Sequence, residues 1–336
     1  MGSKLTVQRS ITPILQHSIA PAINPAFAFA ISLLWLSAQF AFAGLEEYSA
    51  LVVADKDASA SLPRSAIRVT YLGVNGFQFQ ADGHALLVDP YFSRVSFWGA
   101  AFNRPIEPNR ARVADGLANL QPRADAVLVT HAHFDHLLDV PAVMERTHAP
   151  LLAGASAVNL ARALGVPRDQ CRIVQPGSTK TIGPWTIRIF AAQHDRLFGF
   201  VPFQGKAGAR SKAPAKPSDW VVGEALAFVI AADGERIYID SGGVPGYPPD
   251  AAIGHVDLAI LGAALPDSRQ RFAEVVRQLQ PRYIFPSHQD DFFLPLNRGF
   301  IFNKLTNFPY LLRTHQEAHL PGRLVLLDYF QPWTLR

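Results

Sequence analysis

The stretch that decides the fold is residues 126–136, which read AVLVTHAHFDH. The apolar, valine-rich beginning predicts a buried β-strand. Four metal-binding side chains follow within six positions: His131, His133, Asp135 and His136. In an extended chain, residues two apart face the same way, so His131 and His133 can reach one ion together. If the chain then turns into a helix, Asp135 and His136 are presented at a neighbouring point.

Three further candidates each stand where another strand is expected to end: His194, Asp240 and His288. Each alone is weak evidence, because a histidine after a strand is often a surface residue. Together with the first four they make five histidines and two aspartates, which suffice for two adjacent ions with room for water. Cys171 is the single cysteine, so nitrogen and oxygen atoms must supply the ligands. This chemistry favours two Zn²⁺ ions, and Mn²⁺ or Fe²⁺ are also compatible.

The chain resembles the metallo-β-lactamase superfamily, in its branch of lactonase-like and phospholipase-D-like hydrolases. The resemblance rests on the motif His131-x-His133-x-Asp135-His136, on the order of the later candidates and on the segments Tyr71-Leu72-Gly73 and Leu87-Val88-Asp89-Pro90, and it spans about 67–327. It implies one metal held by His131, His133 and His194, a second held by Asp135, His136 and His288, and Asp240 bridging the two.

Two features depart from that family pattern. The family often has Gly-Asp-Thr around the bridging aspartate, whereas this chain has Ile239-Asp240-Ser241. Residues 205–217, rich in Lys, Ala, Gly and Pro, form an insertion that we expect to be a mobile loop. This insertion weakens any analogy of substrate.

Runs of strand-like residues with helices between them occur twice along the chain. Alternating or apolar runs predict strands at 67–72, 77–80, 85–88, 126–130, 186–190, 226–230, 236–239, 283–285 and 324–327. Helices are expected from Pro141, over 156–164 and around 272–279. The pattern favours an α+β fold, an αββα sandwich of two mixed β-sheets flanked by helices, as one domain over 65–336. Asp89 stands at a strand end, where it is expected to cap the strand or to orient a metal ligand.

The N-terminal residues 1–43 carry Lys4 and Arg9 but no acidic residue, and 26–43 are mostly apolar. They end in Ala41-Phe42-Ala43, which suits cleavage of a signal peptide and export to the periplasm or the medium. A membrane anchor formed by residues 20–43 is the alternative, and a buried core helix is the third option. Residues 44–64 are expected to be a linker.

The expected function is hydrolysis of an ester, lactone or phosphodiester-type bond. Two cations lower the pKa of a shared water, and Asp135 with this metal-bound water is the catalytic candidate. No Gly-x-Ser-x-Gly nucleophile motif is present. A non-catalytic metal-binding protein on the same fold and a nucleic-acid-processing enzyme are the alternatives. The formal charge of +4, of which Lys4 and Arg9 contribute two, argues against nucleic acid.

The substrate is expected to be a small or lipid-like molecule, in part anionic. Two segments, 93–112 and 196–219, should overhang the metals and are rich in basic residues: Arg94, Arg104, Arg110, Arg112, Arg196, Lys206, Arg210, Lys212 and Lys216. Arginine and lysine there would attract a phosphate, and a membrane could lie close by. The alternative is that these side chains only keep a solvated loop soluble.

Overall fold

The computed structural model describes residues 44–57, 61–63 and 65–335. The targeting segment predicted at 1–43 lies outside the described residues, so its cleavage or retention stays a prediction. Among the helices that are described, none is both long and apolar enough to cross a membrane.

The predicted linker is partly packed onto the domain. A 3₁₀ helix, Leu45–Leu51, buries Leu45 and sets the ring of Tyr48 against those of Phe302 and Phe308. These apolar contacts explain why part of this segment follows the domain surface instead of running free.

Two mixed sheets of seven strands each hold the described chain together. The first sheet has the order β14-β1-β2-β3-β4-β5-β6, with β1 Ile67–Gly73, β2 Gly76–Ala81, β3 His84–Val88, β4 Ala126–Val129, β5 Leu151–Ala153, β6 Cys171–Ile173 and β14 Pro332–Leu335. The second has the order β13-β12-β11-β10-β9-β8-β7, with β7 Thr179–Ile182, β8 Trp185–Ala191, β9 Leu226–Ala232, β10 Glu235–Ile239, β11 Leu258–Gly262, β12 Tyr283–Ser287 and β13 Arg323–Leu324.

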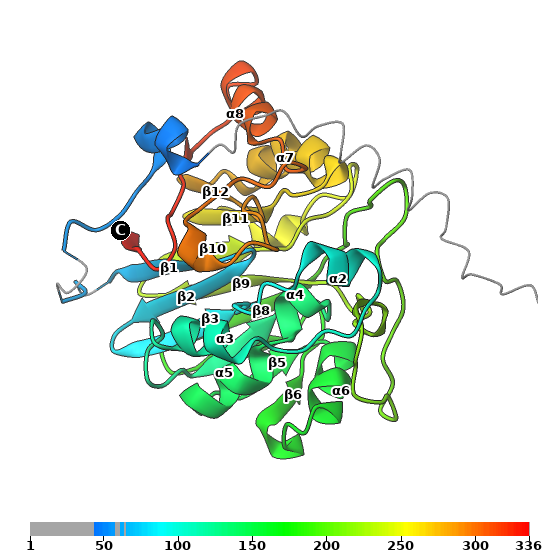
Figure 1. Ribbon diagram of the computed structural model, residues 1–336. Helices are drawn as coiled ribbons and strands as arrows, with labels where there is room; N and C mark the ends of the chain where they lie inside the picture. Colours follow the sequence, from blue (N-terminus) through cyan, green and yellow to red (C-terminus); the bar gives the residue numbers. More distant parts are fainter. Residues whose placement is uncertain (1–43, 58–60, 64, 336) are drawn as a thin grey trace, which may run out of the picture. The chain divides into compact units, whose positions relative to one another are not determined.

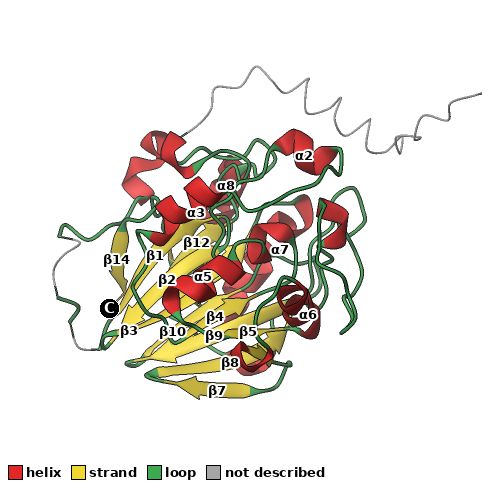
Figure 2. Cartoon of the chain, turned by 60° about the horizontal axis from the view of Figure 1, so that its bottom comes forward, coloured by secondary structure: helices red, strands yellow, loops and turns green. Residues whose placement is uncertain are grey.

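The core lies between the sheets, and helices cover the outer faces (Figures 1 and 2). Inward side chains of both sheets, such as Phe79 and Phe228, join one buried cluster. On the outer face of the first sheet, Val127 and Val129 pack with residues of the covering helices in a second cluster. The helices are α2 Phe97–Ala101, α3 Arg110–Leu117, α4 Phe134–Leu137, α5 Val140–Thr147, α6 Ala155–Ala163, α7 Pro266–Leu279 and α8 Phe308–Glu317. This layering confirms the predicted αββα sandwich.

Strand direction brings the important loops to one edge of each sheet. β3, β4 and β5 run parallel, so the residues after β3 and β4 leave the sheet side by side. β10, β11 and β12 are also parallel, and β8 runs the same way because it is antiparallel to β9, which is antiparallel to β10. The candidate residues after β4, β8, β10 and β12 therefore follow carboxyl ends of strands, where ligands of α/β sheets commonly bind.

Two segments differ from the sequence-based expectation. The strand expected at 324–327 forms regular pairs only at Arg323–Leu324, with one isolated bridge from Leu326 to Val52. The insertion at 205–217 has no regular strand, as expected for a loop, but hydrogen bonds hold it to α6. The Ala207 amide donates to Ser156 Oγ at 3.1 Å, and the Asn159 side chain donates to the Ala207 carbonyl at 2.9 Å.

Candidate metal centre

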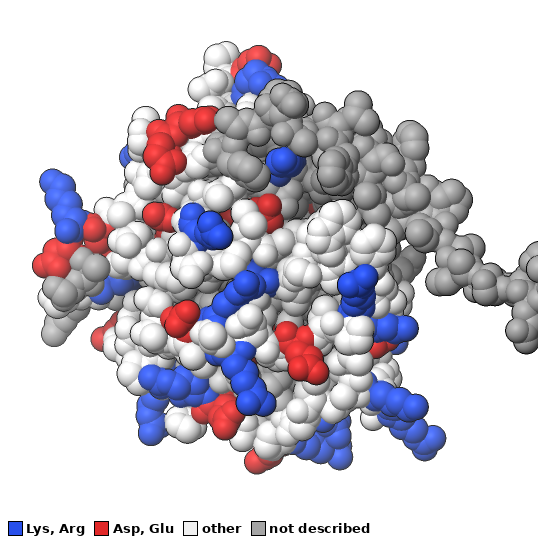
Figure 3. Space-filling view, viewed as in Figure 1, with Lys and Arg blue, Asp and Glu red and all other residues white. Residues whose placement is uncertain are grey.

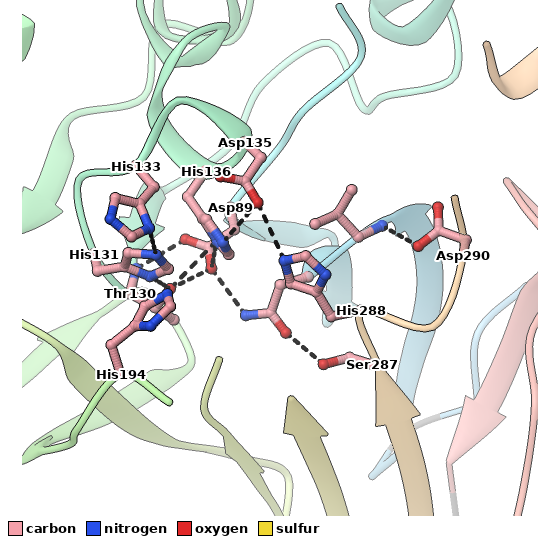
Figure 4. A network of polar contacts seen from close by, with 12 residues as sticks. Asp89, Thr130, His131, His133, Asp135, His136, His194, Ser287, His288 and Asp290 are labelled. Carbon is pink, nitrogen blue, oxygen red and sulfur yellow. Dashed lines mark hydrogen bonds and ion pairs between the residues drawn. The ribbon is translucent and has the colours of Figure 1, made fainter. Parts of the chain in front are cut away.

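The segment after β4 turns directly into the short helix α4. β4 ends at Val129, the chain bends at Thr130 and His131, and His133, with an extended backbone, occupies the position before the helix begins. The short helix carries Asp135 and His136, and the Asp135 side chain points toward His288 (Figure 4). The expected turn into a helix is present, and His131 and His133 reach one group although the chain bends at His131 instead of continuing as a strand.

Three histidines form the first group. Ligand atoms of His131, His133 and His194 all lie within 4.8 Å of one another, and His131 Nε2 is 2.9 Å from His133 Nδ1. Burial, together with the charge of neighbouring imidazoles, lowers the pKa of His131 and His133 well below the ordinary value. Neutral imidazoles with lone pairs facing one another are what a metal ion requires.

Acceptors on the far side of two of these rings fix which nitrogen carries the hydrogen. His133 donates from Nε2 to the Pro202 carbonyl at 3.0 Å, which leaves Nδ1 as the lone pair facing His131. His194 donates from Nδ1 to the Asp195 carbonyl at 2.7 Å, which leaves Nε2 as the free nitrogen. Partners of this kind commonly orient histidines that ligate metals.

Asp135, His136 and His288 form the second group (Figure 4). Asp135 Oδ2 lies 3.1 Å from His288 Nε2 and 3.5 Å from His136 Nε2. Burial alone would lower the pKa of His136, but the carboxylates of Asp135 and Asp89 raise it to about 10. The group thus favours positive charge between its carboxylates, which is the charge that a bound cation would supply.

Asp89 holds the second group in place. Its carboxylate accepts hydrogen bonds from the Thr130 amide at 2.8 Å, the Thr130 hydroxyl at 2.5 Å, Asn75 at 2.9 Å and His136 Nδ1 at 2.8 Å. Ser287 donates to Asn75 at 2.6 Å, which links the end of β12 to the same network (Figure 4). Of the two roles expected for Asp89, the structure favours orienting a histidine. Asn75 was not identified from the sequence, because the turn at Gly73–Gly76 contains no recognisable metal-binding or catalytic motif.

The segment after β12 is anchored through Val74. The His288 amide donates to the Val74 carbonyl at 2.7 Å, and the Val74 amide donates to Asp290 Oδ1 at 2.9 Å. Asp290 also binds Arg94 Nη1 at 2.8 Å, and both of these side chains are fully buried. Asp290 therefore positions His288 indirectly, through β1 and the turn after it.

Asp240 is the one predicted ligand that the structure leaves outside both groups. It is fully buried at the end of β10 and binds Tyr238 and Arg271. The structure thus brings together six of the seven predicted residues, and their binding of metal stays a prediction.

Comparison with known proteins agrees with this geometry. Residues 68–288 match the family model described as the beta-lactamase superfamily domain. The chain belongs to this family. It is 27% identical to a UPF0173 metal-dependent hydrolase of Myxococcus xanthus over 253 residues, which are 74% of this chain and 78% of the relative. It is also 27% identical to one of Anaeromyxobacter sp. over 235 residues, 67% of this chain and 75% of the relative.

Solved structures show how far the fold of this superfamily domain is shared. An isothiocyanate hydrolase from Delia radicum gut bacteria superposes with a TM-score of 0.52 at 17% identity, covering 80% of this chain and 98% of that one. CmlA, a diiron β-hydroxylase of Streptomyces venezuelae, gives 0.53 at 18% identity, covering 82% of this chain and 55% of that one. The two proteins are named for different reactions, so the fold alone does not fix the chemistry.

Aromatic rings lead away from the second group of this superfamily domain. Starting at His288, each ring contacts the next at centroid distances of 4.1–5.6 Å, through Phe292, Phe293, Phe97, Trp98 and Phe102. Trp98 is 46% exposed, so the row reaches the surface. On the other side, Phe203 packs against His133 at 6.0 Å.

Several of the basic residues expected around the centre have structural partners. Arg94 is buried against Asp290, Arg112 donates to the carbonyls of Ser93 and Arg94, and Arg196 pairs with Asp267 at 2.6 Å. The expectation that all of these basic side chains face a substrate is therefore too broad. Lys206 is exposed but lies 3.8 Å from Glu224. The exposed ones that remain are Arg104, Arg210, Lys212 and Lys216, with Arg110 at the start of α3.

Proposed function

We propose that this chain is a metal-dependent hydrolase that holds two divalent ions, most suitably Zn²⁺, and cleaves an ester, lactone or phosphodiester-type bond. The observation that carries the proposal is the convergence of two three-residue groups at one sheet edge. The rings of His131 and His136, one from each group, have centroids only 4.0 Å apart, so two ions would be neighbours. The relatives named as metal-dependent hydrolases support the same reading.

The donor atoms fit divalent ions of the zinc type. Five imidazoles and one carboxylate supply nitrogen and oxygen, and hydrogen bonds on the outer sides of His133, His136 and His194 leave their inner nitrogens free. When bound, such ions would polarise a carbonyl or phosphoryl oxygen and lower the pKa of water. The chain itself orients the ligands: α4 carries Asp135, and Asp89 fixes the ring of His136.

The surroundings favour a substrate with an apolar part and an anionic part. The aromatic row from His288 to Phe102 offers apolar surface, and Phe198 on the other loop is 59% exposed. Exposed cations on 204–216 add positive charge. On the face that Figure 3 shows, basic and acidic side chains lie among each other, without the continuous basic groove that a nucleic acid would need.

We also propose export, with membrane anchoring as the alternative, on the strength of Lys4, Arg9 and the apolar 26–43. Aromatic side chains at the mouth of the centre would suit work close to a lipid surface in either case. Intact mass of the protein purified from its own host decides between the two: cleavage predicts a chain beginning at Gly44, and anchoring predicts an intact chain in the membrane fraction.

The proposed reaction is tested on protein reconstituted with zinc. We expect close to two ions per chain by elemental analysis and hydrolysis of at least one member of a panel of lactones, β-lactams, carboxylic esters and phosphodiesters. Removing the ions with a chelator should abolish turnover, and zinc should restore it. A reconstituted protein without bound metal would refute the proposal.

A further inference from the structure

The carboxylate of Asp240 has no lone pair left for a metal ion. Oδ2 accepts hydrogen bonds from the Tyr238 hydroxyl at 2.8 Å and from Arg271 Nη2 at 2.6 Å. Oδ1 accepts from the amides of Gly242 at 3.2 Å and Gly262 at 3.1 Å. A carboxylate offers about four lone-pair sites, so these four donors saturate it.

Arg271 depends on this carboxylate. It comes from α7, is only 5% exposed, and its guanidinium packs so closely on the turn after β10 that a Cβ added to Gly243 would overlap it. Turning Asp240 toward the histidines would leave the charge of Arg271 buried without its ion-pair partner, which is strongly destabilising. The pair therefore fixes the direction of Asp240.

The next residue faces the histidines instead. Successive side chains of a strand point to opposite sides, so Ser241 is directed away from Arg271. It lines a small cavity together with His131 and His194. Its hydroxyl oxygen is buried and has no hydrogen-bond partner among the described residues. The polar group that this strand end offers to the three-histidine group is thus a neutral hydroxyl.

We propose that Asp240 does not bridge the two metal ions: it is a positioning residue bound to Arg271, and Ser241 presents its hydroxyl to the three-histidine group. This inference rests on the proposed function and deepens it. Asp135 is then the one carboxylate among the ligands, so two bound ions would keep more positive charge than they would with a second carboxylate. Such a centre favours substrates that bring their own negative charge, such as phosphodiesters or carboxylates.

The test separates metal affinity from the stability of the metal-free protein. Asp240→Asn, Arg271→Met and the double variant are unfolded by urea without metal, and their zinc content and affinity are measured by chelator competition. We expect each single variant to be less stable than wild type, and the double variant to lose less than the sum of both. Zinc affinity of Asp240→Asn should stay within about twofold of wild type, whereas Asp135→Asn should lose about tenfold or more.

The opposite result overturns the proposal. If Asp240→Asn loses about tenfold in zinc affinity while the metal-free protein keeps its stability, Asp240 acts on the metal centre and not through Arg271, and the proposal fails. If Asp240→Asn does not fold, Asp240→Leu combined with Arg271→Met replaces the pair by apolar side chains, and its zinc content decides the same question.

The placement of Ser241 is tested by two substitutions at this position. Ser241→Asp should raise zinc affinity relative to Ser241→Ala if this side chain faces the centre, and an equal or lower affinity contradicts its placement. A wild-type protein that binds no zinc refutes the proposed function, but the coupling of Asp240 to Arg271 in the metal-free protein still shows which partner Asp240 has.

Discussion

At the scale of single residues, hydrogen bonds made by the outer nitrogens of the histidines fix which nitrogen faces the metal centre. His136 donates its Nδ1 hydrogen to Asp89, so its Nε2 faces Asp135. The ligand types and their order were readable from the sequence, because spacing of two in a strand and a turn into a helix follow from chain geometry. The direction of Asp240 was not readable, because a shift of one residue at a strand end turns a side chain to the other face.

Replacing Asp89 by Asn should weaken metal binding. The Asn side chain can still accept a hydrogen bond from the Thr130 amide. The substitution removes the negative charge that holds the ring of His136 and supports the basicity of its imidazole. We expect a loss of about 10- to 100-fold in zinc affinity, measured by chelator competition. Asp125→Asn is the matched control, since Asp125 also binds a histidine, His84, but at the opposite end of β3. Equal affinities of both variants would show that Asp89 does not act on the metal.

At the scale of elements, parallel strands do most of the positioning. β3 and β4 end side by side, which puts Asp89 next to Thr130 and the first histidines. The predicted ends of β4, β8, β10 and β12 lie within two residues of the observed ones, because apolar runs are strong signals. The short strands β5, β6, β7 and β14 were missed because three or four residues carry too little periodicity to be recognised.

The buried pair of Arg94 and Asp290 ties the segment after β3 to the segment after β12. Arg94→Met should destabilise the metal-free protein by about 3–5 kcal/mol at neutral pH, because it leaves a buried carboxylate unpaired. Burial alone would raise the pKa of Asp290, but Arg94 and the hydroxyls of Tyr71 and Tyr329 lower it below the ordinary value.

That lowered pKa gives the variant a pH signature. Because the folded pKa lies below the unfolded one, the stabilisation is present above the unfolded pKa and is lost as the pH falls through the folded pKa. The stability difference between wild type and Arg94→Met, from urea unfolding across pH, should therefore shrink in acid. A difference that does not change with pH would contradict the assignment.

At the scale of the whole molecule, substrate choice belongs to the loops around the centre. The segment 196–219 touches the first group through Pro202 and Phe203 and carries exposed Arg210, Lys212 and Lys216. The sequence identified this positive charge but not which basic side chains are engaged, because ion pairs such as Arg196 with Asp267 join distant parts of the chain.

Replacing Arg210, Lys212 and Lys216 together by Ser should lower kcat/KM selectively for anionic substrates. The loss should shrink as salt rises, because salt screens exposed charges over about 8–10 Å. Rates on anionic and neutral substrates across a salt series measure the effect. The control removes the same charge elsewhere, by changing Arg168, Arg172 and Lys180 to Ser. Identical, salt-independent rates in wild type and both variants would contradict a role of these loop cations in substrate binding and would indicate that they only keep the loop soluble.

The pairing of β14 with β1 has a consequence for folding during synthesis. Residues 67–70 are made early, but their partners on one side are 332–335, at the other end of the described chain. On the ribosome, one edge of β1 therefore lacks its partner strand throughout most of the synthesis of the chain. Until 332–335 are made, the backbone groups on this side of β1 lack the partner strand of the folded protein, so this edge is open to pairing with other chains.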